Sequence, residues 1–115
     1  MKIAIASDDK ILVSNHFGKA LGFMVFNIIN GKIINQEYRE NIGKNSGKCG
    51  SCNHSLMIKN IQDCNIVISY GMGQGIYLDL IKNKITPLIT DEDHVENALK
   101  KFLTNQLINR IDKLH

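Results

Sequence analysis

The sequence predicts one α/β domain, with a mixed five-stranded sheet between helices that cover its two faces in a three-layer arrangement. Two strand-like apolar runs are joined by Asn30-Gly31, a pair typical of a tight type I′ β-hairpin. Farther along, short apolar runs alternate with helical patterns, which is typical of parallel βαβ units. At 115 residues, the chain has the length of a single domain.

The first half of the chain predicts an antiparallel meander. Strands are expected at residues 2–7, 23–29 and 32–39, since these runs are apolar and bounded by turn-forming residues. Residues 14–18 have no periodicity and are expected to form a loop between the first two strands.

The second half predicts two crossover units. A short helix is expected at 53–62, a buried strand at 64–69, a helix at 76–83 after a glycine turn, and a fifth strand at 85–89. The fifth run contains Pro87, which has no N–H to donate to a neighbouring strand. This strand should therefore lie at an edge of the sheet.

The final helix has the clearest pattern. Thr90 or Asp91 is expected to cap it, and apolar residues recur at the three- and four-residue spacing of a core-facing helix. These residues are Val95, Ala98, Leu99, Phe102 and Leu103. The expected domain spans 1–103, and residues 104–115 are expected to form a helical extension that packs on the domain or on a second subunit.

Composition narrows the classes of function. The net charge is only +3, the lysines are scattered and there is no tryptophan, so no basic surface with interleaved aromatic residues is expected and nucleic-acid binding is disfavoured. No apolar run is long enough to span a membrane, and the N-terminus lacks a signal-peptide pattern. A cytoplasmic protein is expected.

Cys49-Gly50-Ser51-Cys52, followed by His54, is the segment richest in potential chemistry. Two thiolates at this spacing can bind one soft or borderline metal. Because a closed zinc site or an iron–sulfur cluster normally takes four protein ligands, this segment needs another donor. His16 or a second subunit in a homodimer would supply it.

Two other interpretations of the cysteines stay open. The pair could cycle between dithiol and disulfide, since a helix expected just after Cys52 would lower the pKa of its thiol. A thioredoxin-type pair, however, directly follows a strand, and here a long polar stretch intervenes. The second interpretation is that the thiols are exposed and have no function.

A glycine-rich stretch, Gly71-Met72-Gly73-Gln74-Gly75, separates a buried strand from a helix. The amides of Gly71, Gly73 and Gly75 could contact an anion or a cluster at this helix start. A purely structural turn is the alternative. The spacing differs from the dinucleotide fingerprint, although Asp91 stands about 20 residues further on, as a ribose-binding acid would.

Three stretches together resemble the dinitrogenase iron-molybdenum cofactor biosynthesis family. They are the start Met1–Asp8, the loop Ser14–Ala20 with its S-x-H-F-G-x-A pattern, and Asp63–Ile68 leading into Gly71-Met72-Gly73. The resemblance covers about residues 1–103. It implies a ribonuclease-H-like fold and a small domain that binds or carries iron–sulfur or iron–molybdenum clusters.

The resemblance is less specific for the ligands, because the family's loop at the position of the Cys49–His54 segment varies in length and content. Taken together with the Cys49–His54 segment, the resemblance implies a non-enzymatic carrier whose cluster is held by Cys49 and Cys52, with His54 and His16 as further ligands. The glycine amides would assist, zinc is less favoured as the metal, and cluster donor and acceptor proteins would be partners. The alternatives are a thiol–disulfide redox protein and a structural or regulatory module without a cofactor.

Two other candidates are interpreted as structural. Cys64 begins a buried strand and is expected to lie in the core. Asp8 and Asp9 follow the first strand, but the strand at 64–69 ends in Ser69-Tyr70 without a carboxylate. A two-metal nuclease site is therefore not expected.

Overall fold

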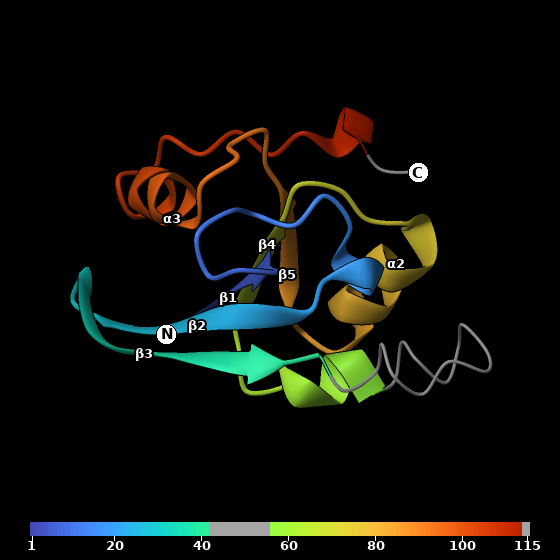
Figure 1. The fold of residues 1–115 in the computed structure, drawn as a ribbon, viewed down its shortest axis with the longest axis horizontal. Coiled ribbons are helices and arrows are strands. Elements are labelled where there is room, and N and C mark those ends of the chain that lie inside the picture. Colours follow the sequence, from blue (N-terminus) through green and yellow to red (C-terminus); the bar gives the residue numbers. More distant parts are fainter. Residues whose placement is uncertain (42–55, 114–115) are drawn as a thin grey trace.

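The computed structural model describes residues 1–41 and 56–113 and confirms a mixed five-stranded sheet of order β3-β2-β1-β4-β5. The strands are β1 (Lys2–Ser7), β2 (Gly22–Ile29), β3 (Lys32–Glu40), β4 (Ile66–Ser69) and β5 (Thr86–Ile89). β1 is antiparallel to β2 and parallel to β4, while β4 is parallel to β5. The meander followed by parallel crossovers is thus present as predicted (Figure 1).

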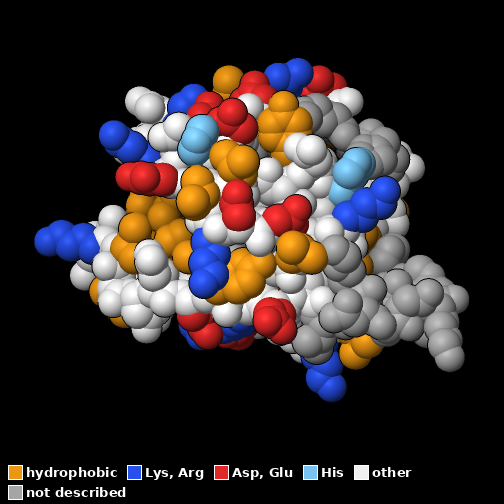
Figure 2. All heavy atoms as spheres, viewed as in Figure 1, with side chains coloured by type: hydrophobic (Ala, Val, Ile, Leu, Met, Phe, Trp, Pro, Cys, Tyr) orange, Lys and Arg blue, Asp and Glu red, His pale blue; other side chains and the backbone are white. Residues whose placement is uncertain are grey.

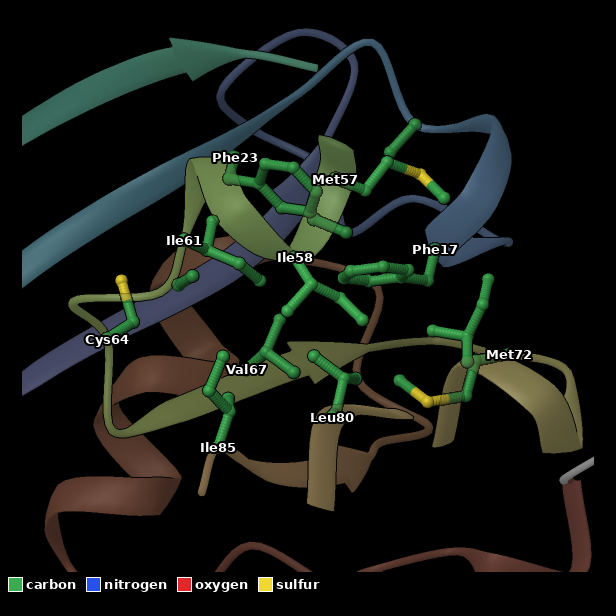
Figure 3. Packing of buried hydrophobic residues seen from close by; sticks show 14 of the residues in the cluster. Phe17, Phe23, Met57, Ile58, Ile61, Cys64, Val67, Met72, Leu80 and Ile85 are labelled. Carbon is green, nitrogen blue, oxygen red and sulfur yellow. The ribbon is translucent and has the colours of Figure 1, made fainter. Parts of the chain in front are cut away.

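The helices lie on both faces of the sheet. Residues 56–60 are helical, and they cover one face together with α2 (Gln74–Lys82), whereas α3 (Val95–Leu103) covers the other (Figure 1). Each face has its own buried cluster. Figure 3 shows the cluster beneath residues 56–60 and α2, into which Phe17 and Met72 point from loops at one edge of the sheet.

The predicted hairpin is confirmed. Asn30 and Gly31 have φ angles of 53° and 77°, the two positive values that a type I′ turn requires. The β2–β3 pairing shifts register between Asn27 and Ile28, so β3 carries a β-bulge near its start.

The second crossover differs from the prediction in its boundaries. β4 begins at Ile66 rather than at Cys64, because the N–H of Cys64 donates to the Ile61 carbonyl at 2.9 Å and so belongs to the turn that ends the preceding helix. α2 begins at Gln74, so that Gly75 lies in its first turn rather than in the preceding loop. Pro87 lies in β5, an edge strand, as predicted.

The prediction that Thr90 or Asp91 caps the last helix is wrong. α3 begins at Val95 with His94 as its N-cap, because the preceding residues bond to the β1–β2 connection. The N–H of Val13 donates to the Asp93 carbonyl at 2.8 Å, and Leu12 forms a β-bridge with His94. Asp93 and His94 are therefore held against this connection rather than in the helix, and His94 is extended.

The segment after α3 is mostly irregular where a helical extension was predicted. Within residues 104–113, the only helical turn is the 3-10 turn Ile111–Lys113. The N–H of Ile89 donates to Asn109 Oδ1 at 3.0 Å, and the N–H of Arg110 donates to the Ile89 carbonyl at 2.7 Å. The segment is thus bonded to the last residue of β5. Within the described residues, no helix is both long and apolar enough to cross a membrane.

Replacement of Gly22 by alanine tests how closely β2 and β3 pack. A Cβ at this position would lie 2.4 Å from the Tyr38 ring and 2.5 Å from the Arg39 carbonyl oxygen. We expect Gly22→Ala to lower the free energy of unfolding in urea by about 1–3 kcal/mol, the usual cost of overpacking. Unchanged stability would show that the ring and the strand move aside at no cost.

Candidate functional site

The loops that the sequence analysis singled out lie together where the parallel strands β1 and β4 end, at the carboxyl-terminal edge of the sheet. β1 and β4 are parallel neighbours, so their carboxyl ends meet at the same edge, where open α/β sheets bind ligands. The loop after β1 is hydrogen-bonded to the loop after β4. The N–H of Tyr70 donates to the Ser14 carbonyl at 3.2 Å, and the N–H of Phe17 donates to the Gly71 carbonyl at 3.0 Å.

His16 lies at this edge on a fixed backbone. It precedes the 3-10 turn η1 (Phe17–Lys19), and its carbonyl accepts hydrogen bonds from Ser14 Oγ and the Lys19 N–H, each at 3.2 Å. Phe17 is fully buried and contacts Phe23, with 5.2 Å between ring centroids. The anchored phenylalanine therefore holds the loop while His16 itself remains exposed.

The three glycines have different environments. Gly71 is buried; its carbonyl accepts from Ser69 Oγ at 2.8 Å and its N–H donates weakly to the same oxygen at 3.4 Å. Gly73 is the N-cap of α2 and Gly75 is exposed in the first turn. The first turn of α2 contains no acidic residue and Gly73 provides no side-chain cap, so no side chain there offsets the positive end of the helix. Because α2 follows β4 after a short loop, this positive end lies near the carboxyl end of β4.

Cys49, Cys52 and His54 lie outside the described residues. Among residues 1–41 and 56–113, no group of three or more His, Cys, Asp or Glu side chains is arranged to hold a metal ion. The described part of this edge offers the His16 imidazole and main-chain amides rather than a complete ligand set.

Asp8 and Asp9 act as turn-forming groups. Asp9 Oδ1 accepts the N–H groups of Leu12 at 2.8 Å and Ile11 at 2.9 Å, and these bonds lower the pKa of the Asp9 carboxyl. Asp8 Oδ1 accepts the N–H of Leu21 at 2.8 Å. Both carboxylates thus fix the chain that leads to His16. On the face in Figure 2, lysine and arginine side chains are scattered rather than gathered in one patch.

The sequence interpretation missed a set of polar contacts between the described residues that flank 42–55 in the sequence. Arg39 forms a two-pronged ion pair with Asp63 at 2.6 and 2.9 Å, and Asn60 Nδ2 donates to the Glu40 carbonyl at 2.7 Å. These partners are far apart in sequence and follow no motif. The one available signal was that Arg39 is one of only two arginines.

The chain belongs to the dinitrogenase iron-molybdenum cofactor family, whose model matches residues 1–105. An uncharacterized protein of Methanocaldococcus jannaschii, MJ0580, is 30% identical over 107 residues, which cover 93% of this chain and 89% of the relative.

Solved structures share the fold. A protein named PH0822 superposes with a TM-score of 0.80 at 24% identity, covering 97% of this chain and 96% of its own. The apo form of the orange protein from Desulfovibrio gigas superposes with a TM-score of 0.78 at 19% identity, covering 94% and 91% respectively. These similarities confirm a compact α/β domain.

Cys64 provides a test that separates the third thiol from the other two. It is 3% exposed, and burial raises the pKa of its thiol to about 11. In a Cys49→Ser/Cys52→Ser chain at about pH 8, we expect iodoacetamide to leave the folded protein unmodified and to alkylate it in urea, as followed by mass spectrometry. Rapid alkylation of the folded chain would contradict a core role for Cys64.

Proposed function

We propose that this protein binds or carries an iron–sulfur or iron–molybdenum-type cluster during cofactor assembly and catalyses no reaction of its own. The observation that carries the proposal is the family match over residues 1–105, nearly the whole chain. The arrangement of the His16 loop and the start of α2 at one edge of the sheet supports it. The cluster is cargo, received from a donor protein and passed to an acceptor.

Each group has a distinct part in the proposal. Cys49 and Cys52 supply thiolates, which bind iron and other soft metals strongly. His54 and His16 supply imidazoles. The first-turn amides of α2 attract the negative charge of a thiolate-ligated cluster, as helix N-termini attract anions. A reducing cytoplasmic compartment would keep the thiols available.

Removal of the two thiols tests the ligand assignment. After anaerobic reconstitution with iron and sulfide, we expect Cys49→Ser/Cys52→Ser to lose the bound iron and its visible charge-transfer absorption. Cys64→Ala is the matched control, because it removes a buried thiol and should keep the cluster. Equal iron content in the wild type and the double variant would overturn the assignment. A colourless wild type that cycles between dithiol and disulfide would support the redox alternative.

The contribution of α2 can be tested by a nearly isosteric change of charge. Gln74 is exposed in the first turn, so Gln74→Glu places a carboxylate beside the first-turn amides. We expect helix stability to rise slightly, by up to about 1 kcal/mol, while cluster affinity falls about three-fold through repulsion. Gln106→Glu, on the exposed C-terminal segment, should change neither. Unchanged cluster affinity in Gln74→Glu would remove α2 from the site.

A further inference from the structure

A groove lies between α3 and the β2–β3 hairpin, on the face of the sheet opposite to α2. Its volume is about 350 Å³, within the range of small-molecule sites. Described residues of the β1–β2 connection, β2, β3 and the start of α3 line it. In Figure 2, hydrophobic side chains gather between the hairpin and α3.

The floor of the groove is apolar and already packed. Met24 and Phe26 of β2, together with Leu99 of α3, belong to the buried cluster beneath α3 and also line the groove. Ile33 forms the wall on β3 and is 46% exposed. An apolar ligand would therefore cover Ile33 while resting on side chains that are in place before it binds.

The charged side of the groove is fixed by its backbone. Lys10 has a φ angle of 74°, a left-handed conformation that residues with side chains rarely adopt and that is typical of functional sites. Its N–H donates to Ser7 Oγ at 2.9 Å. The next residue is bonded to α3, since the N–H of Val95 donates to the Ile11 carbonyl at 2.8 Å. Lys10 Nζ lies 5.2 Å from the centre of the Tyr38 ring, a contact that favours this position of the ammonium.

The charged and apolar parts lie toward opposite ends of the groove. Lys10 follows the carboxyl end of β1, and Met24 pairs with Ile5 near that end. Ile33 pairs with Ile28, which lies farther along β2. The strand from Met24 to Ile28 spans about 13 Å, so the groove suits an extended molecule with a polar head and an apolar chain.

The polar groups on the rim define the charge of that head. Lys10 offers an ammonium. His94 adds an imidazole whose Nδ1 lies 2.7 Å from Asp93 Oδ1, so Nε2 is the ring atom that remains to bond a ligand. Glu96 is exposed on the α3 side and would repel a second negative charge. A single carboxylate beside Lys10 complements this rim.

We propose that the groove binds a medium-chain monocarboxylate, with its carboxylate at Lys10 and its apolar chain along Met24, Phe26 and Ile33. The site shares no residue with the His16 loop or the glycine stretch. It is therefore a second binding site, independent of whether the protein carries a cluster.

The test is an NMR titration of the full chain with octanoate below its critical micelle concentration. We expect the methyl signals of Ile33 and Leu99 to shift, and that of Leu78, exposed on α2, to stay unchanged. Octanoate should bind more tightly than octanol or octyltrimethylammonium. Lys10→Gln should weaken octanoate binding about two- to five-fold without affecting octanol, whereas Lys82→Gln on α2 should affect neither.

Two neighbouring residues of β3 provide a matched pair for the apolar contact. Ile33 and Ile34 are 46% and 52% exposed, but successive strand residues point to opposite faces and only Ile33 lines the groove. We expect Ile33→Gln to weaken the binding of both octanoate and octanol about five-fold. Ile34→Gln should leave both affinities unchanged.

Three results would overturn the proposal. Octyltrimethylammonium binding as tightly as octanoate would show that the charge of the ligand is wrong. Absence of any methyl shift with octanoate would show that the groove takes no such ligand. A dimer in sedimentation velocity that Ile33→Gln dissociates and Ile34→Gln does not would show that a second copy of the chain covers the groove.

Discussion

The parallel pairing of β1 with β4 is the constraint on which the rest of the molecule depends. It joins the meander to the crossover half and brings the carboxyl ends of two strands from distant parts of the sequence to one edge. Parallel neighbours need a connection that crosses a face of the sheet, and the helix at residues 56–60 and α2 cover one face in this way. α3, which follows the last strand, covers the other face. The hydrogen bonds between the His16 loop and the chain after Ser69 then follow from the position of the two strand ends.

Much of the fold could be predicted because it depends on local patterns. The alternation of apolar strands with helices, the Asn30-Gly31 turn and the position of Pro87 each express a preference of a few neighbouring residues. The start of α3 could not be predicted in this way. Thr90 and Asp91 are good caps in isolation, but the bond from Val13 to Asp93 and the bridge between Leu12 and His94 delay the start of the helix. Tertiary contacts between distant segments thus overrode local capping preference.

The grouping of the candidate loops was predictable, whereas the contacts that hold them were not. The sequence singled out His16 and the glycine stretch, and the structure brings their loops together; that they bind a cluster stays a prediction. The network of Arg39, Asn60 and Asp63 could not be found, because each contact joins residues about 20 positions apart and depends on the packing of β3 against residues 56–63. Long-range polar contacts of this kind leave no periodic trace in a single sequence.

The C-terminal segment has a consequence for the solution behaviour of the domain. It occupies the main-chain N–H and carbonyl of Ile89 at the outer edge of β5. Without it, these groups could pair with a strand of another chain. Pro87 weakens such pairing, because it contributes no donor. The opposite edge, β3, is broken by its bulge and carries charged residues at Glu37 and Arg39. The two edge strands are thus protected by different means against pairing with a strand of another chain.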